Sequence, residues 1–195
     1  MTEDVQNVQA KPKPKSELWE WAKAIIIALV LVFLIRTFLF TPTVVSGDSM
    51  EPNFHDKQRL IVNILIYSIR EPRHGEVIVF HAPFEDEGKD FIKRIIALPG
   101  DKVRVEGDNV YINDTKIEET YIQGMVTNRA SLGMGFNYRG FEERIVPEGK
   151  VFVLGDNRPI SKDSRDIGFI DMDEIVGRAD LLIWPPADFG FVNHD

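Results

Sequence analysis

The chain has 195 residues and a formal net charge of −8 at pH 7, so it is long enough for one globular domain and a short additional segment. It contains no cysteine, which excludes a disulfide framework and a thiolate metal site. The acidic balance argues against nucleic acid as a partner, and the spacing of the histidines fits no metal site. We therefore expect no nucleic acid, no metal and no other cofactor.

Residues 1–17 form the first predicted element. They are polar and include Lys11, Lys13 and Lys15, a composition typical of a disordered tail. Basic residues collect on this side of the next segment, and after Arg36 the next basic residue is Lys57. The positive-inside rule therefore predicts that the tail is cytoplasmic and that the chain beyond the segment is extracellular.

The segment that follows, residues 18–40, has the length and apolarity of a membrane anchor. It contains an unbroken apolar run over 24–35, and it opens with Trp19 and Trp21, residue types suited to a membrane interface. A helix over this segment would span roughly 30 Å, about one hydrocarbon core. Arg36, near its far end, can extend its charge to the interface. We predict one N-terminal transmembrane helix.

The alternative interpretation of this segment is a cleaved signal peptide, because an apolar core of this length suits either. Residues 41–45, however, contain no Ala-x-Ala cleavage site. An uncleaved anchor is therefore favoured, with residues 41–195 as the exported domain.

The exported domain is rich in short apolar, β-branched runs separated by Gly, Pro, Asn and Asp. The runs cover residues 59–65, 76–81, 91–98 and 151–154. Residues 102–112 have the pattern of a β-hairpin, and the best short helical candidate is 171–176. Residues 107–147 are interpreted as a small β insertion, with a long loop at 124–140. The predicted class is mainly β, an antiparallel-sheet domain preceded by one transmembrane helix.

Ser49 is the first candidate for chemistry, in the segment 46–52 shortly after the anchor. A serine needs a base to become a nucleophile. The Gly-x-Ser-x-Gly pattern of α/β-hydrolases does not occur around it, and the chain lacks the βαβ alternation of that fold. His74 and His81 could in principle serve as the base, but each is more simply an ordinary loop or strand-end residue.

Lys93 is the better candidate for the base. It lies in the strand-like segment 91–96, where apolar neighbours disfavour the charged ammonium. On its own it would be interpreted as a solvated strand lysine. A third segment, 155–165, would be a polar turn on its own. Its Ser161 hydroxyl could hold a neutral amine without adding charge, and Asp163 with Arg165 could form an ion pair that clamps the loop.

Together these segments resemble the bacterial type I signal peptidases with a single N-terminal anchor. The matching parts are the anchor and residues 46–52, 75–80, 93–101 and 155–165, in the order typical of that family. The resemblance implies a membrane-anchored serine endopeptidase that removes N-terminal signal peptides from exported preproteins. It implies Ser49 as nucleophile, Lys93 as general base, Ser161 as the residue that orients the lysine, and Asp163 with Arg165 as support.

The resemblance also implies how the oxyanion and the substrate are bound. The backbone N–H of Ser49 would be one oxyanion donor. Some relatives add a serine hydroxyl two residues earlier, where this chain has Gly47, so the second donor stays open. An extended peptide would add as a strand between the segment before Ser49 and the segment with Lys93. The implied pocket residues are Val45, Met50, Phe54, Phe91 and Ile92.

Small pockets of this kind would select Ala-x-Ala before the cut, and the apolar surface near Ser49 would contact the lipid bilayer. Two other functions are weighed against this one. A self-cleaving repressor with a Ser/Lys site carries a DNA-binding domain, for which this chain has no room. A non-catalytic, membrane-tethered extracellular β-domain that binds a partner remains the alternative.

Overall fold

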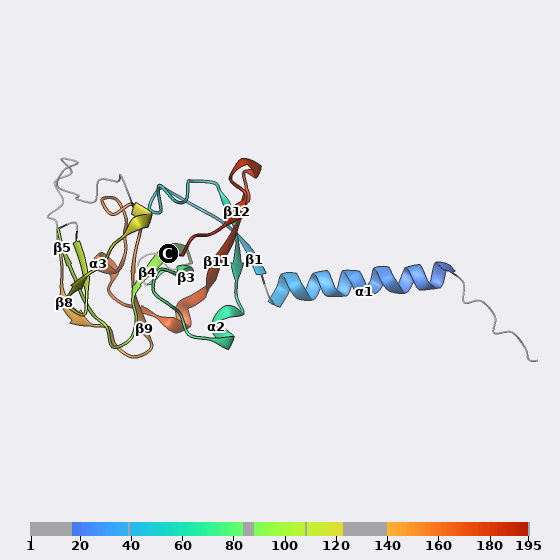
Figure 1. Ribbon diagram of the computed structural model, residues 1–195. Helices are drawn as coiled ribbons and strands as arrows, with labels where there is room; N and C mark the ends of the chain where they lie inside the picture. Colours follow the sequence, from blue (N-terminus) through green and yellow to red (C-terminus); the bar gives the residue numbers. More distant parts are fainter. Residues whose placement is uncertain (1–16, 39, 84–87, 108, 123–139, 195) are drawn as a thin grey trace, which may run out of the picture. The chain divides into compact units, whose positions relative to one another are not determined.

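The structure, a computed structural model, describes residues 17–38, 40–83, 88–107, 109–122 and 140–194 (Figure 1). The predicted tail, apart from Glu17, and most of the predicted loop at 124–140 lie outside the described residues. The chain divides into two compact units, Met1–Thr37 and Phe38–Asp195.

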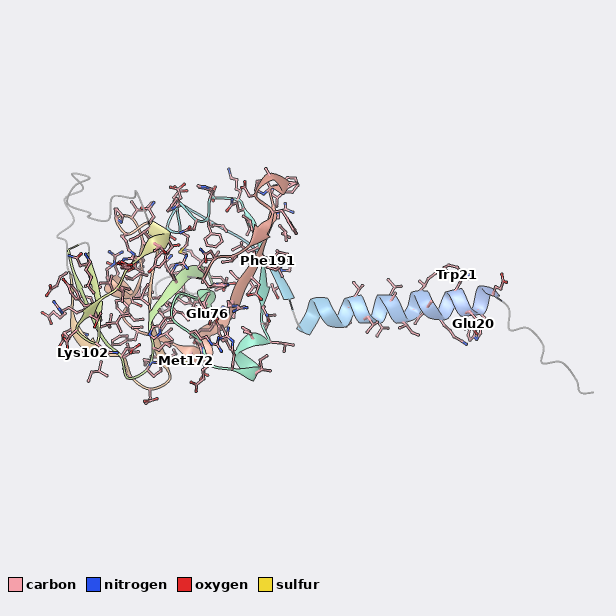
Figure 2. The ribbon with its side chains drawn as sticks, viewed as in Figure 1. Glu20, Trp21, Glu76, Lys102, Met172 and Phe191 are labelled. Atoms are coloured by element: carbon pink, nitrogen blue, oxygen red, sulfur yellow. The ribbon has the colours of Figure 1, made fainter. Side chains whose placement is uncertain are left out.

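The helix α1 (Glu17–Phe38) lies in the first unit except for its last residue. Its described apolar side chains are exposed, among them Trp21 at 70 % and Phe33 at 65 %, and Trp21 projects from the helix surface (Figure 2). Within the residues that the structure describes, no helix combines the length and the apolar character that crossing a membrane requires.

The second unit is built around an eight-stranded antiparallel sheet. Its path is β1-β2-β11-β3-β4-β9-β10, and β12 pairs with β11. The strands are β1 (Phe40–Val44), β2 (Arg59–Asn63), β3 (Val77–His81), β4 (Asp90–Ala97), β9 (Lys150–Leu154), β10 (Ile170–Asp171), β11 (Ile175–Trp184) and β12 (Gly190–Phe191). The four predicted strand runs coincide with β2, β3, β4 and β9, and the mainly β, antiparallel class is confirmed.

A smaller, four-stranded sheet has the order β7-β6-β5-β8. Its strands are β5 (Lys102–Glu106), β6 (Asn109–Ile112), β7 (Thr115–Lys116) and β8 (Phe141–Ile145). Val103 pairs with Ile112 and Val105 with Val110, so the predicted hairpin is confirmed. Three of the four strands lie within the predicted insertion, 107–147, and β5 precedes it.

Among the described residues of the second unit, helical structure is confined to short segments. They are α2 (Ile66–Ile69), α3 (Ser164–Ile167), and the 3-10 turns η2 (Thr120–Ile122), η4 (Met172–Glu174) and η5 (Pro186–Asp188). The predicted helix at 171–176 is wrong. One 3-10 turn occupies its centre, and Ile175 already belongs to β11, where it pairs with Phe80.

The core that supports β4 comes from both faces of the large sheet. One cluster joins Leu60, Val62, Val77 and Val79 to Ile92 of β4. A second cluster holds buried residues of β3, β4 and β9, including Ile78, Ile95 and Val153. Because apolar side chains pack on both faces, the middle of β4 is buried, and any charged residue there needs a partner or must lose its charge.

Candidate active site

Ser49 lies in a tight turn between β1 and β2. Val45 precedes Ser49 in the sequence and Met50 follows it. Both belong to the core cluster that contains Ile92, and they are 3 % and 1 % exposed. Gly47 has φ +80, a conformation that favours glycine, and its N–H donates to Asp56 Oδ1 at 2.9 Å. The turn is therefore fixed by core packing on both sides and by a hydrogen bond to the following loop.

Lys93 projects from β4 toward this turn. Its Nζ lies 2.7 Å from Ser49 Oγ and donates to the Ile92 carbonyl at 2.9 Å. The side chain is 4 % exposed, and this burial lowers the pKa of Lys93 to about 8, against the opposing effect of Asp163 and Asp156. A much larger fraction of neutral amine is therefore present near neutral pH than an exposed lysine would have.

The loop after β9 packs directly against the Ser49 turn. The backbone N–H of Asn157 donates to the Ser49 carbonyl at 3.0 Å, and its side-chain amide donates to the Asp48 carbonyl at 3.0 Å. A Cβ on Gly155 would lie 2.1 Å from Ser161 Oγ and 2.5 Å from the Ser49 carbonyl oxygen. Only a glycine permits this approach, so backbone contacts bring the motif 155–165 against the Ser49 turn.

Asp163 and Arg165 form the ion pair that the sequence suggested. Arg165 Nε and Nη2 each lie 2.8 Å from a carboxylate oxygen of Asp163, which also accepts the Gly155 N–H at 3.1 Å. Burial works to raise the pKa of Asp163, but hydrogen bonds from Arg165, Gly155 and the Ser161 hydroxyl hold it below its usual value. Ser161 is fully buried in the same loop. The loop therefore keeps a buried, ionised carboxylate near Lys93.

Ser49 and Lys93 open onto a cleft of about 500 Å³. Of the pocket residues that the resemblance implied, Val45, Met50, Phe91 and Ile92 line this cleft. Phe54 is 4 % exposed and packs in the core cluster of Met50 and Ile92, while Gly47 lies in the turn described above. Neither is among the described residues that line the cleft.

The two histidines considered as bases are far more exposed than Lys93. His74 pairs with Asp101 at 2.7 Å, and His81 pairs with Asp90 at 2.8 Å. Their side chains are 52 % and 62 % exposed, and neither lines the cleft among the described residues. The arrangement at Ser49 therefore favours an amine base.

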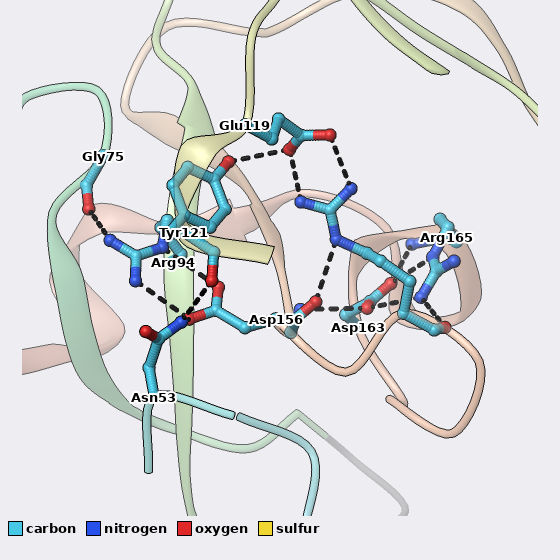
Figure 3. Close-up of polar contacts among 10 residues, drawn as sticks. Asn53, Gly75, Arg94, Glu119, Tyr121, Asp156, Asp163 and Arg165 are labelled. Carbon is cyan, nitrogen blue, oxygen red and sulfur yellow. Dashed lines mark hydrogen bonds and ion pairs between the residues drawn. The ribbon is translucent and has the colours of Figure 1, made fainter. Parts of the chain in front are cut away.

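A buried ion pair beside Lys93 was missed by sequence reasoning. Arg94, 1 % exposed, donates to Asp156 Oδ1 at 3.0 Å and Oδ2 at 2.8 Å, and Asn53 donates to Asp156 Oδ2 at 2.8 Å (Figure 3). An arginine in an apolar strand signals that a buried carboxylate must be near. Nothing local identifies that partner, which lies 62 positions away.

Comparisons with known proteins show which proteins this chain is similar to. A crystal structure of a signal peptidase I from Enterococcus faecalis V583 is 32 % identical, covers 56 % of this chain and 97 % of its own, and superposes with a TM-score of 0.42. The "Signal peptidase I" of Bacillus amyloliquefaciens is 39 % identical over 182 residues, covering 93 % of this chain and 96 % of that protein.

The "Signal peptidase IB" of Staphylococcus aureus strain MRSA252 is 38 % identical over 184 residues, covering 91 % of this chain and 95 % of that protein. Residues 18–184 match the family described as "Signal peptidase, peptidase S26". The family resemblance drawn from the sequence is confirmed, and the chain belongs to the signal peptidases of peptidase family S26, which are serine peptidases.

Proposed function

We propose that this enzyme removes N-terminal signal peptides from secretory preproteins with Ser49 as the nucleophile and Lys93 as the general base. Signal peptide removal by a serine peptidase follows from the family. The observation that carries the residue assignment is the 2.7 Å distance between Lys93 Nζ and Ser49 Oγ, with the amine buried and its pKa lowered to about 8.

The reaction follows from this geometry. Neutral Lys93 accepts the Ser49 hydroxyl proton while Oγ attacks the scissile carbonyl carbon, and the resulting ammonium gives that proton to the leaving amine. A water then loses a proton to Lys93 and attacks the acyl carbon, the bond from that carbon to the Ser49 oxygen breaks, and the Lys93 ammonium returns its proton to Ser49 Oγ. The Ser49 N–H is one oxyanion donor. Because the Gly47 N–H is already bound to Asp56, the second donor must be another group.

Ser161, Asp163 and Arg165 support the base in this proposal. Asp163 and Arg165 fix the shape of the loop through two hydrogen bonds of 2.8 Å. The Ser161 hydroxyl is hydrogen-bonded to Asp163, and a Cβ on Gly155 would lie 2.1 Å from its Oγ. A rigid loop at this point limits the positions that the Lys93 amine can take.

The preprotein would bind as an added strand in the cleft. β1 is an edge strand of the large sheet, and β9 pairs with β4 only from Arg94 onward. Residues of β1 and the first half of β4 line the cleft together, so each offers backbone groups to an extended peptide. The side chains of Val45, Met50, Phe91 and Ile92 line this cleft, and the proposal is that they admit only the small side chains of Ala-x-Ala sites in secretory preproteins.

Residues 18–40 are proposed as the membrane anchor of this enzyme. The exposed apolar side chains along α1 require a cover, and a lipid bilayer provides one. By the positive-inside rule, residues 1–17 are then cytoplasmic, and residues 41–195, with the insertion at 107–147, form an extracellular catalytic domain on the cell membrane.

The test is cleavage of a purified preprotein by the full chain in detergent, with the product N-terminus read by mass spectrometry. Wild type should cut after the Ala-x-Ala site, and Ser49→Ala should not. Ser68→Ala, a change in the distant helix α2, is the matched control and should cut normally. A wild-type protein that binds the preprotein without cutting it would support the non-catalytic alternative instead.

A further inference from the structure

A segment of the smaller sheet reaches into the polar network behind the candidate active site. Glu119 follows β7, and its carboxylate forms a two-point ion pair with the Arg158 guanidinium, in which Arg158 Nη1 donates to Glu119 Oε2 at 3.0 Å. The two side chains are 7 % and 4 % exposed. A buried, forked pair of this kind fixes both groups in one orientation.

Arg158 transmits this constraint to the loop that carries Ser161. Its Nε donates to the Gly155 carbonyl at 3.0 Å, and its own carbonyl accepts from Arg165 Nη2 at 2.7 Å. Gly155 touches the Ser49 carbonyl and Ser161, as described above. The Nη atoms of Arg158 therefore bind Glu119, while its Nε binds the Gly155 backbone, which packs against Ser49.

Tyr121 gives the same segment a second connection. Its hydroxyl donates to Glu119 Oε1 at 2.7 Å, and its ring centroid lies 4.1 Å from the Arg94 guanidinium carbon (Figure 3). Its carbonyl accepts from the Asn53 side chain at 2.8 Å. Arg94 follows Lys93 on β4, and Asn53 follows the Ser49 turn, so Tyr121 contacts the supports of both candidate catalytic residues.

We propose that Glu119 is a positioning residue for the Ser49–Lys93 reaction, acting through Arg158 and Tyr121. This inference rests on the proposed function. Neither Glu119 nor Arg158 lines the cleft among the described residues, so a change at Glu119 leaves substrate contacts in place. It alters the placement of the loop behind the base, and a displacement of this kind lowers kcat rather than substrate binding.

The experiment measures kcat and KM on a preprotein peptide for the full chain in detergent, with the folded fraction determined by circular dichroism at the assay temperature. Glu119→Gln keeps the shape and removes the charge. It should lower kcat per folded enzyme by about 10-fold or more and change KM by less than about twofold. Arg70→Gln is the control, because it breaks another ion pair with a buried carboxylate, that of Glu76, away from the loop. It should lower the unfolding temperature without lowering kcat.

A folded Glu119→Gln enzyme with wild-type kcat would overturn the inference, as would an equal kcat loss in Arg70→Gln. If Glu119→Gln does not fold, Tyr121→Phe decides. It keeps the ring on Arg94 and removes only the hydroxyl that contacts Glu119, and it should lower kcat by about threefold or more, whereas an unchanged kcat would overturn the inference.

Ser49→Ala is measured in parallel to test the proposed function itself. Activity in that variant would contradict the proposed function itself, whereas an inactive Ser49→Ala beside a normal Glu119→Gln would remove the positioning role alone.

Discussion

Gly155 and Ser161 are in such close contact that a single added carbon cannot be placed between them. A Cβ at Gly155 would lie 2.1 Å from the Ser161 hydroxyl oxygen and 2.5 Å from the carbonyl oxygen of Ser49. The two parts of the candidate site, one before β2 and one after β9, thus meet at a glycine. Their relative position depends on backbone contact as much as on the side chains of the candidate site.

Gly155→Ala should therefore reduce activity severely. The methyl group must push the loop away from Ser49, and a shift of about 1 Å at a catalytic group costs on the order of 100-fold in rate. Gly149→Ala is the control, because Gly149 has φ +71 but open space around it, so alanine there costs stability without displacing the site. Peptide turnover and unfolding temperature of both variants check this. Near-normal turnover in Gly155→Ala would contradict the close contact.

Ser161→Ala should lower kcat by about 10-fold or more while leaving some activity, because it removes an orienting hydroxyl and leaves Ser49 and Lys93 in place. Ser164 is the matched control. It is buried at the start of α3, and its Oγ accepts the Val153 N–H at 2.9 Å, a contact with the backbone of β9. Ser164→Ala should reduce stability and keep kcat. Steady-state kinetics on both variants measure this, and a decrease of kcat below about twofold in Ser161→Ala would reject the role of Ser161.

The sequence pattern identified the strands that carry Lys93 and its neighbours but not the longest strand of the sheet. β11 runs from Ile175 to Trp184 and pairs with β2 and β3, yet Gly177, Arg178 and Asp180 interrupt its apolar pattern. Tertiary contacts compensate for these residues, because Arg178 pairs with Glu76 and Asp180 accepts from the Asn63 side chain. Propensity alone cannot anticipate compensation by residues far along the chain.

The same limit applies to the candidate site. Ser49 and Lys93 are 44 positions apart, and only the family resemblance, not any local pattern, pointed to their contact. Glu119 and Arg158 are 39 apart, and Arg94 and Asp156 are 62 apart, with no motif that links them. A buried charge in an apolar strand predicts that a partner exists, but the fold decides which residue it is.

Replacing Lys93 with methionine should abolish activity and stabilise the fold. The folded-state pKa of about 8 lies below the value near 10.4 expected for an unfolded lysine, so the unfolded chain holds the proton more tightly between these values. Burial of the Lys93 amine therefore lowers the free energy of unfolding by its full amount below about pH 8, and this destabilisation decreases as pH rises toward 10. Lys93→Met should gain on the order of 3 kcal/mol at pH 7. Unfolding at pH 7 and pH 10 checks this, and a loss of stability at pH 7 would contradict it.

Changing the substrate residue just before the cut from alanine to leucine should block cleavage. The cleft near Ser49 is lined by Val45, Met50 and Phe91, of which the first two are almost fully buried and have little room to move. We expect a branched side chain of that size to overlap them. Cleavage of matched peptides with Ala, Val and Leu at this position measures the limit, and efficient cutting after leucine would mean that the pocket is larger than proposed.

The pH dependence of peptide cleavage tests the Lys93 base most directly. With a lysine pKa of about 8, kcat/KM should rise with pH through that region and be weak in mild acid. Lys93→Arg should be inactive at every pH, because guanidinium stays protonated. His74→Ala and His81→Ala should show the same rise of kcat/KM with pH as the wild type. An active Lys93→Arg enzyme would contradict catalysis by Ser49 and Lys93. A rise of kcat/KM centred near pH 6.5 that is lost in either histidine variant would contradict it as well.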